Sequence, residues 1–561
     1  MKRKRRHQNA FERAVRAQMD DRPQDAERQL KRLLQDRPRD HEVLHQLGLV
    51  HWQQGRTDEG LALLEASAAM APTEPRYQAN LGRLYHEMGH GRAAMAALER
   101  AVALAPDNAG GWSSYGVALQ GAGRLDDAVS ALMKATALDG NACEHWQNLA
   151  TAQQALQQWP QAEASLQQAL TLAPGSAEVW TALGAVSEHR QQWAEAESRY
   201  RRALLCVRSH AMAWSNLGGV LRRQGRHDEA IAACEQAIAL EPSLADAYTH
   251  FGLALRAQGH IAPAAATFQR GLQAHVTPEG LLNLADVLDE LGQLESAQHA
   301  LETLCDTFPD FVPGLLAHGR HLLMAGAVQG AAERFARVLV LDPQHAEATH
   351  FQQACRGDVP DCAPSAYVRQ LFDGYADRFE QHLVGALDYN TPQALVDMLD
   401  AATVDTVVDL GCGTGLVGAL IRPLCTELIG VDLSPRMLEK AREKGVYDQL
   451  IEGSIVPVLA DLAEVDLAVA ADVFNYIGDL RPLLQQASMP RMLFSIEEHV
   501  GEAHCVLLPS GRYAHQVEHV SQLAMAAGFA VETLQRVPLR RERGQWVAGA
   551  LFDLRRVAAP Q

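Results

Sequence analysis

Apolar and polar positions follow a helical period over the first 345 residues, and the pattern itself repeats every 34 residues. A bulky aromatic residue and two small alanines return at this step. The aromatic positions are Trp112, Trp146, Trp180, Trp214 and Tyr248, and the alanines are Ala128, Ala162, Ala196, Ala230 and Ala264, with Ala135, Ala169, Ala203 and Ala237 later in each unit. A fixed period of this length predicts one helix hairpin per unit, and the hairpins are expected to stack into a solenoid.

The unit "AGGWSSYGVALQGAGRLDDAVSALMKATALDG" shows how each hairpin is built. Trp112 and Leu119 share one face of its first helix, which ends near Gly123. Ala128 and Ala135 are small where two helices must cross closely. Prolines between repeats stop the second helix, as at Pro72, Pro106, Pro174 and Pro242. The pattern matches the tetratricopeptide repeat (TPR).

In this phase the repeats fall at 41–74, 75–108, 109–142, 143–176, 177–210, 211–244, 245–277, 278–311 and 312–345. Residues 1–40 are predicted to be a basic N-terminus and a degenerate capping repeat, because they retain Ala26, Leu30 and Pro38. The start "MKRKRRHQNA" indicates a solvated, disordered terminus or a nucleic-acid arm.

The 34-residue repeat ends after Pro343. Gly, Pro and Asp are frequent in the next segment, which predicts a linker over 346–366. Strands and helices then alternate over 367–561, which predicts a doubly wound parallel sheet. The expected strands are Thr406–Leu410, Leu428–Val431, Gln449–Ile451, Asp466–Ala470, Arg491–Ile496, Ala530–Val537 and Gln545–Leu554. The last two form an antiparallel hairpin, joined by the charged turn "PLRRERG".

The stretch "VVDLGCGTGLVGALI" carries the candidate chemistry of this second region. Gly413, Gly415 and Gly418 satisfy G-x-G-x-x-G, which binds dinucleotides or related cofactors. No Gly-Lys-Ser/Thr follows, so a phosphate P-loop is excluded. Asp432 ends the second expected strand, where a carboxylate can accept both ribose hydroxyls of either a nicotinamide cofactor or S-adenosylmethionine (SAM).

The region from residue 366 onward resembles class I SAM-dependent methyltransferases, and in particular bacterial chains in which TPRs precede such a domain. Asp409 stands two residues before Gly411, as in the family's first motif, and "FDGYADRFE" is similar to the opening of ubiquinone and menaquinone C-methyltransferase relatives. The resemblance implies SAM as cofactor and no metal. The cofactor-binding residues it implies are Tyr375, Asp409, Gly411, Cys412, Gly413, Gly415, Asp432, Leu433, Met437, Ser454, Ala471, Asp472 and Val473.

The resemblance also gives these residues different roles. The glycines admit the methionine end, where Asp409 meets the amino group through water. Asp432 takes the ribose, and Leu433 and Met437 flank the adenine. Tyr375 reaches the methionine carboxylate, and residues 471–473 line the sulfonium. Ser454 stands near the place of an aspartate that often holds the adenine amino group, so that contact is weaker here.

Methyl transfer from an activated sulfonium depends chiefly on alignment, although an oxygen or carbon acceptor usually needs a base. The candidate bases are Glu497, Glu498, His499, Tyr513, His515 and His519, and for each the alternative is a surface histidine or a helix N-terminal carboxylate. The N-P-P-Y motif of adenine and glutamine N-methyltransferases is absent from "ADVFNYIGD", which disfavours those acceptors.

The solenoid carries candidate partner-binding residues at one repeat position. Asn80, Asn148, Asn216 and Asn283 all precede the Leu-Gly or Leu-Ala pair. The position resembles the asparagine ladder of the O-GlcNAc transferase solenoid, whose amides hold a peptide backbone; the alternative is that asparagine is simply frequent there. We expect a protein or peptide in the TPR groove. Two other functions remain possible alternatives. One is a small-molecule methyltransferase recruited by its repeats, and the other is a scaffold that binds SAM with little turnover.

Composition narrows the partners further. The formal net charge of −18 argues against nucleic acid as the main partner. No apolar run is long enough to span a membrane. The nine cysteines show no zinc-ligand spacing, with Cys355 and Cys362 the closest pair, so reduced thiols in the cytoplasm are expected.

Overall fold

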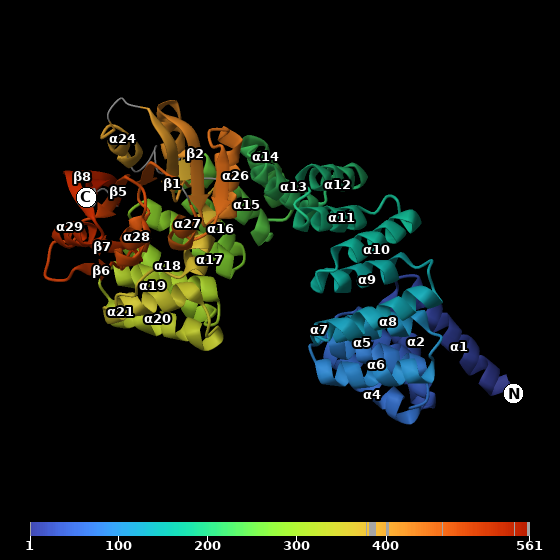
Figure 1. Cartoon of the computed structure of the whole chain (residues 1–561). Helices are drawn as coiled ribbons and strands as arrows, with labels where there is room; N and C mark the ends of the chain where they lie inside the picture. The colour runs from blue at the N-terminus through green and yellow to red at the C-terminus, as the bar shows by residue number, and fades with distance from the viewer. Residues whose placement is uncertain are drawn as a thin grey trace. The chain divides into compact units, whose positions relative to one another are not determined.

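A computed structural model of the chain describes residues 2–376, 379–380, 389–399, 403–462, 464–542 and 545–557. The chain forms two compact units, residues 1–275 and 276–561 (Figure 1). The first contains helices α1–α16. The second contains α17–α21 followed by an α/β domain.

The expected helical solenoid is confirmed, with two helices in each repeat. The helices are α1 (Lys2–Met19), α2 (Pro23–Asp36), α3 (His41–Gln53), α4 (Thr57–Met70), α5 (Pro75–Glu87), α6 (Gly91–Leu104), α7 (Ala109–Gly121), α8 (Leu125–Leu138), α9 (Cys143–Ala155), α10 (Trp159–Leu172), α11 (Ala177–His189), α12 (Trp193–Cys206), α13 (Ala211–Arg223), α14 (His227–Leu240), α15 (Ala245–Ala257), α16 (Ile261–Ala274), α17 (Pro278–Glu290), α18 (Leu294–Thr307), α19 (Val312–Met324), α20 (Val328–Leu341) and α21 (Ala346–Arg356).

The recurring tryptophan has a polar role as well as an apolar one. The Trp112 indole N–H donates to the carbonyl of Pro106, six residues earlier, at 3.0 Å. The tryptophans at the next three repeats make the same bond at 2.9–3.1 Å. The Tyr248 hydroxyl donates to Pro242 at 3.2 Å. The 34-residue step therefore preserves a hydrogen bond that fixes the turn between repeats.

The glycine at one position of the first helix, such as Gly82 or Gly116, lets the two helices of a hairpin approach closely. A Cβ at Gly116 would lie 2.5 Å from Leu132 Cγ and 3.2 Å from the Ala128 carbonyl oxygen. The equivalent Cβ at Gly82 would meet Leu98 at the same 2.5 Å. The recurring Ala128 position is small for the same reason, since its backbone lies against the facing helix.

The N-terminus differs from the disordered segment that was expected. Its backbone is helical from Lys2 to Met19. Ala14 and Ala17 of this helix are buried in a cluster that includes Leu30 of α2 and Val43 of α3. The apolar face of α1 therefore covers the first repeats. The run of basic residues at its start had suggested a disordered segment instead.

The segment predicted as a linker contains helix α21. Its Ala348, His350 and Phe351 are buried, and Gly357 ends it in the left-handed conformation at φ +74°. The linker prediction was wrong for residues 346–356, because the Gly and Pro residues that suggested it lie beyond the helix.

The α/β domain is a seven-stranded sheet in the order β3-β2-β1-β4-β5-β9-β8, as expected for a doubly wound fold. The strands β1–β5 are parallel, whereas β9 is antiparallel to both β5 and β8. The strands are β1 (Val404–Leu410), β2 (Cys425–Asp432), β3 (Gln449–Glu452), β4 (Leu467–Ala470), β5 (Arg491–Glu497), β8 (Phe529–Glu542) and β9 (Gln545–Arg556), with a separate hairpin of β6 (Cys505–Leu507) and β7 (Tyr513–His515).

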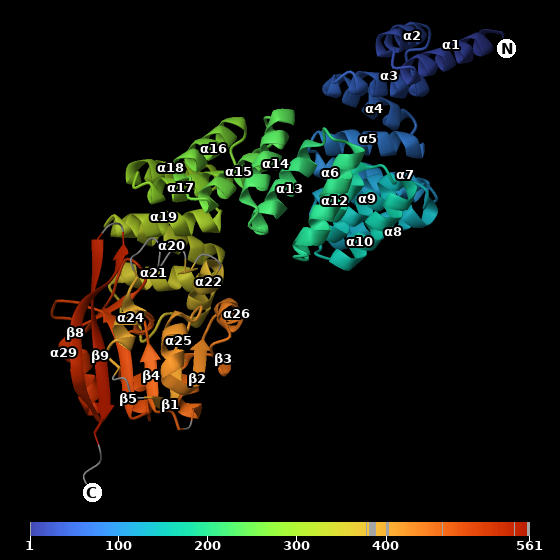
Figure 2. The ribbon, with the colours of Figure 1, turned by 90° about the horizontal axis from the view of Figure 1, so that it is seen from above.

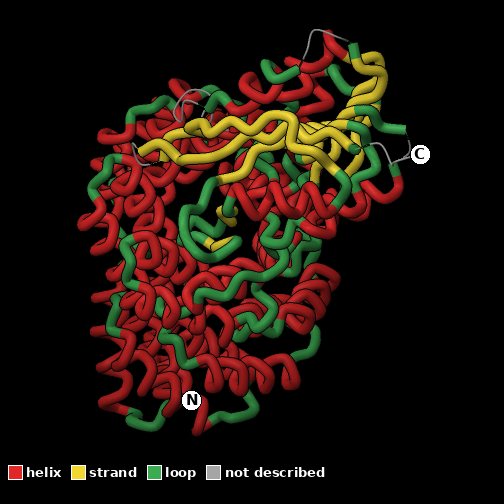
Figure 3. The backbone as a smooth tube through the Cα atoms, turned by 60° about the vertical axis from the view of Figure 1, so that its left-hand side comes forward, coloured by secondary structure: helices red, strands yellow, loops and turns green. Residues whose placement is uncertain are grey.

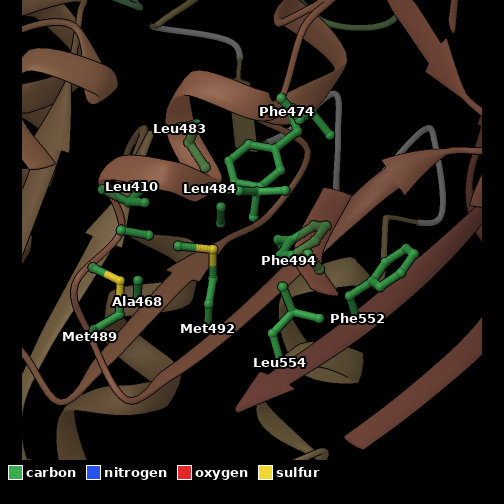
Figure 4. Packing of buried hydrophobic residues seen from close by; sticks show 14 of the residues in the cluster. Leu410, Ala468, Phe474, Leu483, Leu484, Met489, Met492, Phe494, Phe552 and Leu554 are labelled. Carbon is green, nitrogen blue, oxygen red and sulfur yellow. The ribbon is translucent and has the colours of Figure 1, made fainter. Parts of the chain in front are cut away.

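Helices cover both faces of the sheet. The domain's helices are α22 (Ser365–Tyr375), α24 (Thr391–Val396), α25 (Leu416–Ile421), α26 (Pro435–Lys444), α27 (Ile455–Asp461), α28 (Arg481–Gln486) and α29 (Val517–Ala526), with short 3-10 turns η1 (Arg422–Leu424) and η2 (Phe474–Tyr476). Residues of α27, α28 and α29 pack with Val408 and Leu410 of β1, whereas α24 and α25 pack with Val407. Successive strand residues thus face opposite layers. Figure 4 shows the first layer, with Phe474, Phe494 and Phe552 in contact.

The terminal hairpin is longer than predicted, and Figure 3 shows its two long strands. The segment "PLRRE", expected as part of a charged turn, continues β8 as far as Glu542. A register shift between Pro538 and Arg540 bends the strand. Arg540 is consequently 4% exposed, whereas a turn would have placed it in solvent. Among the described residues, no helix is long and apolar enough to cross a membrane.

Candidate functional site

The glycine loop joins β1 to α25, and its three glycines have different surroundings. All have positive φ, at +67° for Gly411, +53° for Gly413 and +88° for Gly415. A Cβ at Gly411 would lie 2.6 Å from Val473, and one at Gly415 would lie 3.1 Å from Tyr447. Among the described residues, a Cβ at Gly413 would meet Phe379 alone, at 3.6 Å, which is an ordinary van der Waals contact. Gly413 is therefore the least crowded of the three glycines.

Asp432, at the end of β2, is bonded to this loop. Its Oδ2 accepts from the Gly413 N–H and its Oδ1 from the Ser434 N–H, both at 2.8 Å. Burial raises the pKa of Asp432, although the backbone N–H groups act in the opposite direction. Each carboxylate oxygen has a second lone pair, so the side chain can still accept two hydroxyl groups.

Asp409 lies beneath the same loop, 1% exposed. Its Oδ2 accepts from the Tyr447 hydroxyl at 2.7 Å, and its Oδ1 has no hydrogen-bond partner among the described residues. Burial raises the pKa of Asp409 to about 7, against the Tyr447 hydrogen bond. A buried oxygen without a donor fits a site that receives a hydrogen-bonding or cationic group.

A lid helix lies against the acid at the end of β2. Asp373 of α22 accepts from the Ser434 hydroxyl at 2.5 Å and from the Arg436 N–H at 3.4 Å. Tyr375 is half-buried at the end of α22, with its ring edge-on to Phe379 at 5.5 Å between centroids. Asp373 was not among the predicted residues, although it stands in the "FDGYADRFE" motif. Part of that motif, residues 377–378, lies outside the described residues.

The remaining predicted cofactor residues fall into exposed and buried groups. Leu433 and Ala471 are half-buried beside the loop, and Ser454 is exposed at the start of α27. Met437 is fully buried in the first turn of α26, so its side chain is not open to a ligand in this conformation. Cys412 is 5% exposed, and its sulfur packs beside Gly430 of β2 and lies 3.9 Å from the Gly413 carbonyl oxygen.

An ion-pair network lies at the carboxyl ends of β4 and β5. Arg540 pairs with Asp472 and Glu497, and its Nε donates to Glu542 at 2.9 Å. Arg512 donates from Nε to the same Glu497 oxygen at 2.6 Å and also pairs with Glu542. Two guanidinium groups therefore tie together three carboxylates from separate elements. We refer to Asp472, Glu497, Arg512, Arg540 and Glu542 as the arginine network.

The network adjoins the glycine loop through Asp472. This residue has φ +56°, a strained conformation for a non-glycine residue, and its Oδ1 accepts from the Ser495 hydroxyl at 3.0 Å. The next residue, Val473, packs on Gly411. Burial raises the pKa of Asp472, against the neighbouring Arg540 charge. The ion pair with Arg540 and the Ser495 hydrogen bond therefore fix Asp472 next to the glycine loop.

Four of the six candidate bases, Glu497, His499, Tyr513 and His515, are the predicted catalytic residues. The structure places them in distinct environments. Glu497 is 3% exposed and belongs to the arginine network, where two guanidinium groups neutralise it. Tyr513 is fully buried against α21 and α22. His515 bonds to the Phe474 carbonyl at 3.3 Å, and burial lowers its pKa to about 4. His499 is half-buried and is the least enclosed of the four.

The other two candidate bases have partners of their own. Glu498 accepts from Arg536 Nε at 2.7 Å, and His519 stacks on His504 with centroids 4.0 Å apart. The members of the arginine network that the sequence did not indicate include Arg512 and Arg540. The charge run around Arg540 predicted a solvated turn, and only the bulge in β8 brings it inward.

The asparagines of the solenoid share a position and are all half-buried. Within the first unit, Asn80 bonds to His45 and Asn148 to Ser113, each at 3.1 Å and each to the first helix of the preceding repeat. Asn216 lies near the Tyr200 hydroxyl. Each amide retains further donor and acceptor capacity. Asn283 lies in the second unit.

Comparisons with known proteins identify both parts of the chain. A family model described as a methyltransferase domain matches residues 408–489. Tetratricopeptide-repeat models match 17–84, 85–152, 148–208, 209–275 and 282–346.

Curated relatives match the C-terminal part. A human protein named methyltransferase-like protein 27 is 38% identical over 98 residues, which is 16% of this chain and 38% of the relative. Malonyl-[acyl-carrier protein] O-methyltransferase of Salmonella typhimurium is 30% identical over 119 residues, 21% of this chain and 47% of the relative. The chain thus spans less than half the length of these two relatives.

Solved structures resemble the solenoid. The Pseudomonas aeruginosa pilF structure is 24% identical with a TM-score of 0.33, covering 38% of this chain and 99% of that one. The Cut9-Hcn1 structure is 19% identical with a TM-score of 0.39, covering 49% of this chain and 55% of that one.

Proposed function

The chain belongs to the tetratricopeptide-repeat-containing class I methyltransferases, and on this premise we propose that it transfers a methyl group from SAM to a protein held by its repeats. The observation that carries the SAM assignment is the hydrogen bond from the Gly413 N–H to Asp432, at the least crowded glycine of the loop. A carboxylate at the end of the second strand and a glycine-rich loop after the first are what a nucleoside cofactor requires.

The residues present fit this cofactor. Asp432 would hold the ribose and Gly413 would admit the methionine end, beside the unpartnered oxygen of Asp409. When bound, SAM supplies an activated methyl group on a sulfonium. The chain's own contribution is to orient the acceptor and exclude water, for which α22 and the arginine network stand on two sides of the loop. For an acceptor that must lose a proton, we propose His499 as the base.

Calorimetry tests this part of the proposal. Purified full-length protein should bind SAM and show no heat with NAD, since the loop has the surroundings expected of a methyltransferase. Binding of NAD in preference to SAM would contradict the cofactor assignment.

The proposal that the solenoid docks a protein is supported by the asparagine position. Asn80, Asn148 and Asn216 recur at every second repeat of the first unit, and each has spare amide capacity. Amide groups bind an extended backbone irrespective of its side chains. Docking raises the effective concentration of a tethered acceptor, so the rate should depend on the repeats.

Removal of the first unit tests docking. The truncated variant should begin at Val276, because the two compact units divide between His275 and Val276. A cut near Ser365 would separate Phe351 from Tyr367 and Tyr513, which share one core cluster. Residues 276–561 should bind SAM like the whole chain but methylate the protein acceptor slowly. Equal rates for the two would contradict docking.

The asparagines can be tested in the full chain. Triple replacement of Asn80, Asn148 and Asn216 with alanine should raise the KM for the protein acceptor and leave SAM affinity unchanged. Asn141, an exposed asparagine between α8 and α9, provides the matched control. An unchanged KM in the triple variant would contradict the proposal that these asparagines bind the acceptor.

A small-molecule acceptor is the second candidate. It is favoured by the relative named malonyl-[acyl-carrier protein] O-methyltransferase, whose name specifies an oxygen acceptor on an acyl group. Label from tritiated SAM would then be released from protein by organic extraction or by alkali, whereas N-methyl label on a protein side chain would stay in the precipitate.

A further inference from the structure

The last helix of the solenoid makes buried contacts with the α/β domain. His350 of α21 donates from Nε2 to the Gly511 carbonyl at 2.8 Å, and this acceptor requires the hydrogen on that ring nitrogen. The neighbouring Phe351 stacks on Phe335 at 5.4 Å and meets Tyr367 edge-on at 5.9 Å. Figure 2 shows α21 and α22 at the end of the sheet where the parallel strands finish.

Gly511 lies in a tight turn that α21 and α22 hold in place. Its N–H donates to the Leu508 carbonyl at 2.9 Å, and the Leu508 N–H donates to the Arg512 carbonyl at 2.8 Å. The glycine has φ +78°, and a Cβ there would lie 2.9 Å from both Phe351 Cζ and the Tyr367 hydroxyl. No side chain fits between this turn and α21, so the turn takes its position from the helix.

Arg512 is the next residue of the turn and belongs to the arginine network. Its Nε lies 2.6 Å from Glu497, and it shares both Glu497 and Glu542 with Arg540. Arg540 in turn pairs with Asp472, beside Val473 on the glycine loop. A continuous set of contacts therefore runs from His350 to Val473, which packs on Gly411 of the glycine loop.

Resting on the proposed function, we propose that α21 is part of the methyl-transfer site and that His350 is a positioning residue for it. His350 fixes the turn at residues 508–512, the turn fixes Arg512, and Arg512 orients Glu497 and the arginine network toward the acceptor. Buried ion pairs depend on accurate geometry, so loss of one hydrogen bond behind the network should loosen all of it. The helix that follows the last repeat is thus a component of the enzyme site.

Three full-length variants test this assignment. His350→Ala removes the donor to Gly511, and His350→Gln retains an amide donor on a longer side chain. His318→Ala is the matched control, because His318 is a histidine of α19 in the same unit, is 1% exposed, and has no hydrogen-bond partner for either ring nitrogen among the described residues. Hydrogen exchange measured by mass spectrometry reports peptides that cover 495–500 and 508–516, and calorimetry reports SAM binding.

In His350→Ala we expect exchange about tenfold faster in both peptides, the effect of one lost hydrogen bond. His350→Gln should restore most of the protection, and His318→Ala should change exchange only within α19 and α20. Methyl transfer should fall about tenfold in His350→Ala with SAM affinity unchanged. Unchanged exchange at 495–500 in His350→Ala, or an equal effect of His318→Ala, would overturn the positioning role. If the unsubstituted chain transfers no methyl group, the proposed function fails, and the exchange data still decide whether His350 holds the network.

Discussion

Replacement of Asp432 with alanine tests the assignment of the ribose site most closely. The structure shows that this carboxylate accepts the N–H groups of Gly413 and Ser434, and in the proposed site it would hold the ribose as well. Loss of paired hydrogen bonds to a ribose should cost about 2–3 kcal/mol, which raises the Kd for SAM roughly a hundredfold.

The same substitution also changes stability, and the two effects must be separated. Two backbone N–H groups lose a charged acceptor, which costs about 1.5–3 kcal/mol each. Burial of the carboxylate opposes this, as the raised pKa of Asp432 indicates. We therefore expect the free energy of unfolding to fall by only about 1–2 kcal/mol, and the domain should remain folded at 25 °C.

Asp448 offers a matched control near the opposite end of β2. It is exposed, accepts from the Leu428 N–H at 2.8 Å and pairs with Arg422. Asp448→Ala should reduce stability slightly and leave the Kd for SAM unchanged by calorimetry. The ribose assignment is refuted if Asp432→Ala binds SAM within about twofold of the unsubstituted chain, or if Asp448→Ala weakens binding as much.

Three further predictions concern the loop, the buried acid and the repeats. Gly413→Val should abolish SAM binding in calorimetry with the helical circular dichroism intact, whereas Gly123→Val, also at positive φ (+75°) but in open space within the solenoid, should not affect binding. Because the folded-state pKa of Asp409 is raised to about 7 from 3.8, the folded state retains a proton that the unfolded state releases, and stability should fall as pH rises between these values. Asp409→Asn should therefore slow hydrogen exchange of β1 and β2 relative to the unsubstituted chain at pH 8 but not at pH 4. An equal effect at both pH values would show that ionisation of Asp409 is not the cause. Trp180→Phe removes the donor to the Pro174 carbonyl and should lower the free energy of unfolding by about 0.5–1.5 kcal/mol in urea, as should Tyr248→Phe; no change in either would show that the interrepeat bond is dispensable.

The periodic part of the fold was predictable because each recurring residue makes one contact with a neighbour in the sequence. Trp112 reaches a carbonyl six residues earlier, and Gly116 packs on a residue sixteen positions later. Local contacts of this kind leave their spacing in the sequence. The glycine loop and Asp432 were predictable for a similar reason, since parallel strands bring the ends of β1 and β2 together.

The parts that escaped prediction depend on contacts between distant residues. Arg540 is buried because a bulge turns it toward Asp472, 68 residues away, and nothing in "PLRRERG" distinguishes it from Arg541, which is exposed. The contact of His350 with Gly511 spans 161 residues. Tyr513 and His515 were chosen by residue type, yet packing against α21 and η2 places both in the interior.

Transfer of tritiated methyl groups from SAM tests the central claim most directly. Full-length protein and the Asp432→Ala variant are incubated with labelled SAM and an extract that contains both proteins and metabolites, and the products are divided by acid precipitation and organic extraction. The account predicts label in precipitated protein with the unsubstituted chain and far less with Asp432→Ala at a SAM concentration well below the Kd of that variant. Label confined to the organic phase, equal label with both chains, or no transfer at all would contradict it.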